Sequence, residues 1–215
     1  MSTPPAEERK PHVNVYLDLH RKGAPQFLAA KVFKGIADGI TSFKLRVRPG
    51  QSACYPNICV PIAGIIDYFT IEHGCSFSPA ASWRNAPVLN QSGTIHPYVH
   101  DPLASPSSHL SKVWKFSSDD HYDVVHGIIG SMQRAGEMPR GVLQGLELAL
   151  YEVTDNILLH SQDETNSPNA TGYVMAQYHK SEQRIAVAVF DLGQGIPSSL
   201  AKGGIRASSP SEALS

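Results

Sequence analysis

The chain has 215 residues, of which 41% are hydrophobic and 17% are charged, a composition typical of folded globular proteins. Its formal net charge is -1, so it lacks the basic excess that neutralises a nucleic acid backbone. No stretch approaches the ~20 apolar residues of a membrane span, and the opening MSTPPAEERKPH contains no apolar signal core. We therefore expect a cytoplasmic protein that binds neither nucleic acid nor a membrane.

The first half of the chain predicts a small α/β layer behind a disordered tail at 1–11. Alternation predicts strands, and apolar residues three and four apart predict helices. The elements expected in order are a strand at 13–19, a helix at 26–40, a strand at 42–47, a helix at 56–72 and a short strand at 75–78. Pro61 is expected in the first turn of its helix, and Gly74 should end that helix.

Several side chains of this half are assigned to the core. The aromatic residues expected there are Tyr16, Phe27, Phe33, Tyr68 and Phe69. The three cysteines, Cys54, Cys59 and Cys75, are too few for a disulfide framework and lack the usual spacing of zinc ligands, so we expect buried free thiols. The scattered histidines receive no metal role: His96, His100, His109, His121 and His126. Residues 79–111 read as a long irregular connection.

The second half begins with a strand at 112–116 and a helix from Asp119. A longer helix should run from Pro139 to about Ser161, followed by a polar loop at 162–170. Two apolar strands at 172–179 and 184–190 are joined by a charged turn, which predicts an antiparallel hairpin. Gly172 marks a strand start or a close backbone approach.

The longer helix carries Glu152, Asn156 and His160 at steps of four residues. Such steps place all three on one stripe of a helix. Glu can act as a base or hold a metal-bound water, Asn offers an oxygen that suits Mg²⁺, and His can donate to a phosphate. The alternative for Glu152 and Asn156 is a solvated helix face, and His160 is also favoured electrostatically at a helix C-terminus. Asp155 is expected to face solvent.

Asp191, Gly193 and Gly195 form a DxGxG turn directly after the second strand of the hairpin. A carboxylate at this place can accept a hydrogen bond from an exocyclic amine, and the glycines allow a flat ring to approach the backbone. The alternative for Asp191 is a turn former ahead of Gly193. The order of helix, hairpin and glycine turn is more specific than either motif alone.

With both motifs in place, the sequence resembles the GHKL ATPases (gyrase, heat-shock chaperone, histidine kinase, MutL). YEVTDNILLHS at 151–161 looks like the asparagine box of the family, and DLGQGI at 191–196 like its first glycine box. The resemblance covers about half the chain, and its Glu before the Asn is closest to the anti-sigma-factor serine kinases. It implies an α/β fold, an α+β sandwich in which helices of a Bergerat-type ATPase domain lie on a mixed sheet.

The resemblance also implies a role for each matching residue. Asn156 would hold Mg²⁺, Glu152 would be the catalytic base, and His160 would lie near the phosphates. Asp191 would bind the adenine amino group, with Gly193, Gly195 and Ile196 shaping the pocket wall. ATP and Mg²⁺ are the cofactors implied.

The sequence departs from the family pattern after Gly195, because no second glycine box follows and only a possible start of the ATP lid is present. We expect a GHKL domain at 112–215 that is incomplete, from a truncated chain, and a fragment that is inactive by itself. The part at 12–111 resembles a STAS-like α/β module, an assignment that rests on its alternation of strands and helices.

These features predict a Mg-ATP-binding regulatory protein of bacterial signalling, a protein serine/threonine kinase or ATPase in its full-length form. Its partner would be a regulatory protein of STAS type or related to sigma factors, and a homodimer is compatible. The alternatives are a non-catalytic, nucleotide-dependent interaction switch and a fragment of a sensor histidine kinase. A mechanical ATPase of the gyrase kind would need a transducer domain, for which the sequence gives no indication.

Overall fold

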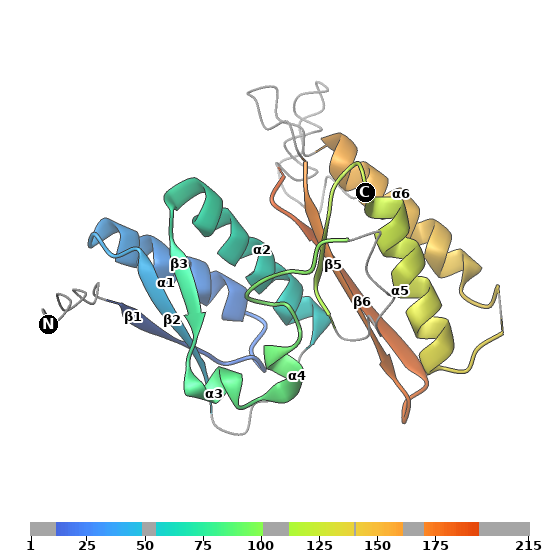
Figure 1. Cartoon of the computed structure of the whole chain (residues 1–215), viewed down its shortest axis with the longest axis horizontal. Helices are drawn as coiled ribbons and strands as arrows, with labels where there is room; N and C mark the ends of the chain where they lie inside the picture. The colour runs from blue at the N-terminus through green and yellow to red at the C-terminus, as the bar shows by residue number, and fades with distance from the viewer. Residues whose placement is uncertain (1–11, 49–54, 101–111, 140, 161–169, 194–215) are drawn as a thin grey trace, which may run out of the picture.

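The computed structural model describes residues 12–48, 55–100, 112–139, 141–160 and 170–193. It is a mixed α/β structure with two small sheets, each of three strands in the described part of the chain. Figure 1 shows the first sheet and its helices on one side, and the second sheet with two long helices on the other. The expected α/β class is thus confirmed.

The first sheet is parallel, in the order β1-β2-β3, with β1 at Val13–Leu17, β2 at Ser42–Val47 and β3 at Ser76–Pro79. Helices α1 at Ala24–Ala37 and α2 at Pro56–His73 are the crossovers. These five elements confirm the order predicted for the first half. Alternate strand residues such as Val15, Leu45 and Phe77 are buried in the core.

Helix α2 ends as predicted, with Gly74 in the left-handed conformation at φ 60°. The prediction for Pro61 is wrong, because this residue lies inside α2 and not in its first turn. An interior proline costs ~3 kcal/mol, and burial of an Ile side chain stabilises by about 1.5–3 kcal/mol. Ile58, Ile62 and Ile66 are all buried, which offsets the proline.

Four of the five aromatic side chains assigned to the core are instead exposed: Tyr16 at 60%, Phe27 at 44%, Phe33 at 53% and Tyr68 at 36%. Only Phe69 is buried. Helix α1 buries a single stripe, which contains Leu28 and Val32, and the phenylalanines fall beside it. Tyr16 lies between two buried strand residues and therefore points to the other face of the sheet.

The described part of the connection, 79–100, is more regular than expected. It contains two short helices, α3 at Ala81–Arg84 and α4 at Pro87–Asn90. Trp83 and Leu89 are 1% and 0% exposed, so these turns are held by apolar anchors. The sequence gives no periodicity over helices of four residues, which is why they were not predicted.

The second sheet is antiparallel in the order β4-β5-β6, with β4 at Trp114–Phe116, β5 at Gly172–His179 and β6 at Arg184–Asp191. The predicted hairpin is confirmed. The three strands are antiparallel, and the parallel pairing expected from the resemblance is limited, among the described residues, to an isolated bridge between Tyr98 and Trp114. Helices α5 at His121–Ala135 and α6 at Gln144–His160 cover one face (Figure 1). Helix α6 begins after Pro139 because Gly141 has a φ of 86°.

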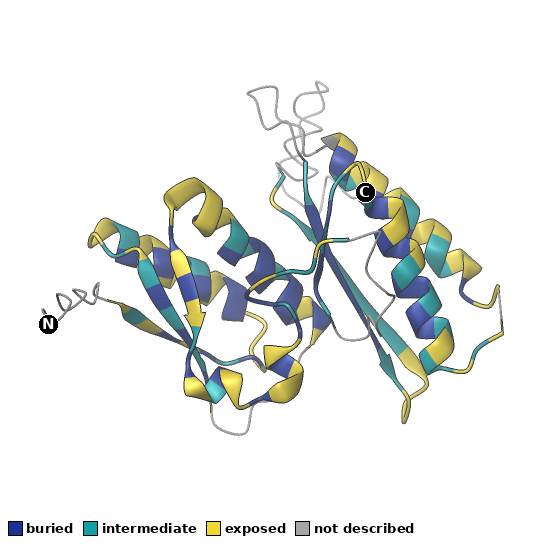
Figure 2. Cartoon of the chain, viewed as in Figure 1, coloured by how far each residue is buried: buried dark blue, intermediate teal, exposed yellow. Residues whose placement is uncertain are grey.

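Helix α2 covers the opposite face of this second sheet and so belongs to both halves of the molecule. Gly64 of α2 allows the approach: a Cβ there would lie 2.6 Å from Phe190 Cε1 and 3.2 Å from Tyr173 Cδ2. The core around the first sheet accordingly includes Tyr173 and Met175 of β5. Figure 2 shows α2 buried along much of its length between the sheets. The domain boundary predicted at 111/112 falls between the two sheets in the sequence. The sheets nevertheless share one helix, because α2 packs on both of them.

Candidate functional site

Helix α6 is held on the second sheet by one apolar stripe. Leu150, Thr154 and Leu158 are 4%, 0% and 6% exposed, and the two leucines share a core with Val174 of β5. The Thr154 hydroxyl donates to the carbonyl of Leu150 at 2.9 Å, so this buried polar group is satisfied within the helix. The rotation of α6 about its axis is therefore fixed by packing.

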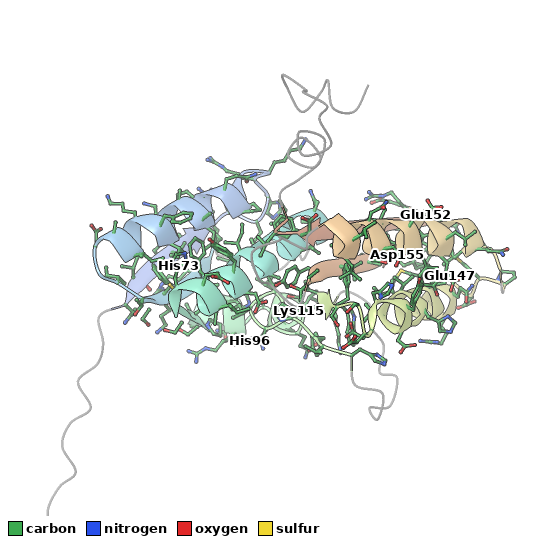
Figure 3. The ribbon with its side chains drawn as sticks, turned by 90° about the horizontal axis from the view of Figure 1, so that it is seen from above. His73, His96, Lys115, Glu147, Glu152 and Asp155 are labelled. Atoms are coloured by element: carbon green, nitrogen blue, oxygen red, sulfur yellow. The ribbon has the colours of Figure 1, made fainter. Side chains whose placement is uncertain are left out.

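Glu152 and Asn156 lie on the exposed side of α6, away from the sheet. Asp155 marks the flank of α6 that faces α5, because it binds His121 of that helix. Successive residues are rotated by ~100° about the helix axis, so the Asn156 side chain points further away from α5 than that of Asp155. In Figure 3, Glu152 lies on the flank of α6 away from α5 and Asp155 on the near flank. Exposure alone also fits a solvated helix face, the alternative that the sequence left open.

Asp191 ends β6, and its backbone pairs with Gly172 at the start of β5. The Gly193 N–H donates to Asp191 Oδ1 at 2.6 Å, which fixes the carboxylate at the turn. No described residue bonds the second oxygen, Oδ2. The Asp191 side chain can therefore form the turn through Oδ1 and still accept a further hydrogen bond at Oδ2.

The helix motif on α6 and the glycine turn after β6 both belong to the second sheet and its helices, but no described hydrogen bond connects them. Helix α6 contacts β6, and in Figure 1 its C-terminal end and the end of the hairpin that carries Asp191 lie at the same end of this unit. No hydrogen bond joins Glu152, Asn156 and Asp191 to one another among the described residues. Gly195 and Ile196 lie outside the described residues, and so does the side chain of His160.

A bridge between α5 and α6 was missed in the sequence. His121 is 6% exposed, with its Nε2 2.8 Å from Asp155 Oδ1 and its Nδ1 3.2 Å from the Ser118 carbonyl oxygen. Tyr122 also donates to Asp155 Oδ2 at 3.3 Å. Asp155 is half exposed, as predicted, but it is not free in solvent. Its partners lie more than thirty residues away in sequence, and no local pattern indicates such a pair.

A second missed cluster ties α2 to the second sheet. Asp67 Oδ2 of α2 accepts from Lys115 Nζ of β4 at 2.6 Å and from the Tyr173 hydroxyl of β5 at 2.5 Å. Lys115 lies near the middle of the molecule in Figure 3. Burial, followed by the hydrogen bond to Asp67, raises the pKa of Tyr173 well above its usual range.

The raised pKa of Tyr173 predicts a loss of stability in alkali. Above about pH 10 the unfolded chain releases the phenol proton while the folded chain keeps it, so folding becomes less favourable as pH rises toward the folded-state pKa. Tyr173→Phe should flatten the fall in the free energy of unfolding, measured by urea denaturation on both sides of this pH. The Glu147-bonded Tyr151, with its pKa raised to about 12, remains in both proteins and serves as the internal reference. If the free energy of unfolding of Tyr173→Phe falls with rising pH as steeply as that of the unchanged chain, the raised pKa of Tyr173 is contradicted.

The expectation of buried thiols is confirmed for Cys59 and Cys75, which are both buried, and Cys54 lies outside the described residues. Burial raises the pKa of Cys75. In the parts of the chain that the structure describes, no three His, Cys, Asp or Glu side chains gather in a way that could hold a metal ion. None of the helices described there is both long and apolar enough to cross a bilayer.

Comparison with known proteins gives no family for this chain. No protein-family model matches it, and searches of curated proteins and of solved structures found no match either. The resemblance to GHKL ATPases therefore rests on the two motifs and on the order of the elements that carry them.

Proposed function

We propose that this chain is a Mg-ATP-binding regulatory protein of the GHKL type, with its nucleotide site formed by α6 and the turn after β6. One combination carries the proposal. Glu152 and Asn156 are exposed on a helix that is fixed to the second sheet, and Asp191 ends a strand of that sheet. A STAS-like module at 12–111 and a GHKL domain at 112–215 are part of the same proposal.

The residues present suit Mg-ATP chemically. The side-chain oxygen of Asn156 is a hard, neutral ligand of the kind Mg²⁺ takes alongside phosphate oxygens. Asp191 uses Oδ1 for the Gly193 N–H, which orients Oδ2 as an acceptor for the amino group of adenine. When bound, Mg-ATP supplies a transferable phosphoryl group whose charge the metal offsets. His160, Gly193, Gly195 and Ile196 complete the proposed site by position.

In this proposal the protein transfers the phosphoryl group to a serine or threonine of a protein partner. Glu152 is the base, because a carboxylate on the exposed side of α6 is accessible to an incoming hydroxyl. The partner is a regulatory protein of STAS type or related to sigma factors, and the setting is the cytoplasm.

A second candidate function is a non-catalytic switch, in which nucleotide binding changes affinity for a protein partner. The packing of α2 on the second sheet favours it, because Gly64 and Asp67 connect the N-terminal half directly to β5 and β6. The two functions differ in the role of Glu152. Glu152→Gln should abolish phosphoryl transfer by a kinase and leave a switch intact.

Titration calorimetry of the chain with Mg-ATP tests the site. We expect saturable binding that Asp191→Asn weakens at least tenfold, because a hydrogen bond to a charged group contributes about 1.5–3 kcal/mol and 1.4 kcal/mol is tenfold in affinity. The matched control is Asp119→Asn, which removes the same charge from an exposed position before α5. If the folded chain binds no Mg-ATP, or if both variants bind equally well, the nucleotide site is refuted.

A further inference from the structure

The sheet β1-β2-β3 has one covered face and one open face. Its inward side chains, such as Leu17, Phe43 and Leu45, are 0% exposed beneath α1 and α2. The side chains between them point the other way and are exposed or half-buried. Parallel sheets are generally covered on both faces, so an open parallel face is a candidate for a binding partner.

The open face is polar. In register across the strands, Lys44 lies between Asn14 and Ser78, and Arg46 lies beside Tyr16. Tyr16 is the one large apolar group among these neighbours, and its ring is covered on one side by the Arg46 guanidinium, 5.5 Å from the centroid. A face of this composition does not suit the apolar side of a helix, which would bury these polar groups without partners.

The open face is also positively charged. Lys44 and Arg46 occupy successive outward positions of the central strand β2. Neither forms an ion pair with any described residue, and Arg46 Nε bonds only the neutral Asn14 Oδ1, at 2.8 Å. The next outward cation, Arg48, is already paired with Asp18 at 3.3 Å. Strands β1, β2 and β3 contain no Asp or Glu, so among the described residues these two cations have no acidic partner, in a chain whose net charge is -1.

We propose that this open face binds an acidic segment of a partner protein in extended conformation. Alternate residues of an extended chain are ~6.7 Å apart, which is also the spacing of Lys44 and Arg46 along β2. Carboxylates at alternate positions of the segment therefore meet both cations, while the hydroxyl of Ser78, opposite Lys44 on β3, donates from the side. This surface is separate from α6 and does not depend on the nucleotide site.

A nucleic acid is a poorer occupant of the same face. Two cations neutralise few phosphates, and phosphate contacts supply most of the affinity for a nucleic acid. The side of the Tyr16 ring beneath Arg46 is not free to stack on a base, as aromatic platforms for single strands do. A protein carboxylate needs only the ion pair and the flanking hydrogen bonds.

Fluorescence anisotropy with a labelled peptide of alternating Glu and Thr, at low ionic strength, tests the proposal on the whole chain. We expect binding that weakens with salt and is absent for the same peptide with Gln in place of Glu. The double variant Lys44→Gln, Arg46→Gln should lower the affinity by about tenfold. The control Lys34→Gln, Lys180→Gln removes the same charge from exposed positions off this face and should bind as well as the unchanged chain. Circular dichroism checks that both variants are folded.

Three results would overturn the proposal. The first is no binding of the Glu-Thr peptide by the folded chain at low salt. The second is an equal loss of affinity in the two double variants, which would mean an unspecific response to net charge. The third is tighter binding of single-stranded oligothymidylate than of the peptide, lost in Lys44→Gln, Arg46→Gln, which would assign the face to nucleic acid.

Discussion

Gly172→Ala should destabilise the protein by about 2–3 kcal/mol, through overpacking of a closed core. Gly172 pairs with Phe116 across β4 and β5, and a Cβ at this position would lie 2.7 Å and 2.8 Å from Cε2 and Cε1 of that ring. Phe116 is 1% exposed and belongs to the core under α5 and α6, so the ring has little room to move. Thermal unfolding should show a melting temperature lower by ~4–12 °C.

The chain provides a matched control in Gly145 of α6, where an added Cβ would meet nothing within 4 Å. Gly145→Ala should stabilise the protein by about 0.4–1 kcal/mol, because alanine restricts the unfolded chain and favours a helix. Combining Gly172→Ala with Phe116→Leu should recover part of the loss, since a smaller side chain makes room for the methyl group. Equal unfolding of Gly172→Ala and the unchanged chain would refute the close approach.

Local patterns predicted most of this fold, because the elements that they describe bury one clear face. Alternation in β2 and the apolar steps of α2 identified both elements within a few residues. The interior position of Pro61 and the exposure of Phe33 were not predictable in this way. Each depends on which stripe of a helix another element covers, and this is decided by packing between distant segments.

The sequence predicted only those residues of the candidate site that belong to a local motif. The spacing of Glu152 and Asn156 implied a shared side of one helix, and both residues are indeed on the exposed side of α6. The bonds from His121 to Asp155 and from Asp67 to Tyr173 join residues more than thirty and more than one hundred positions apart. Side-chain hydrogen bonds of that range leave no periodicity in a single sequence.

The position of α2 explains how events on one half of the chain can reach the other. Its face toward the first sheet and its face toward the second are both buried, so the helix cannot shift against one sheet without shifting against the other. The open basic face of the first sheet and the proposed nucleotide site on α6 lie on opposite outer surfaces of this layered arrangement. Coupling between them would therefore pass through α2 and its contacts with β5 and β6.

Asp67→Ala should destabilise the protein by about 2–4 kcal/mol, because it leaves two donors without their acceptor in a partly buried place. The Tyr173 hydroxyl belongs to a residue that is 1% exposed, and the Lys115 side chain is 25% exposed. Urea denaturation should show the loss as a lower midpoint with an unchanged m-value.

Two further variants separate the parts of this effect. Tyr173→Phe keeps the ring and removes one donor, so it should cost less than Asp67→Ala. Lys115→Met keeps most of the apolar stem and removes the charge, which leaves Asp67 with Tyr173 alone. If the bonds act as a unit, Asp67→Ala combined with Tyr173→Phe should cost less than the sum of the two single losses, because each removes the same hydrogen bond. Strictly additive losses would mean that the Asp67 carboxylate and the Tyr173 hydroxyl do not interact, and the polar contact of Asp67 with the second sheet would then be the ion pair with Lys115.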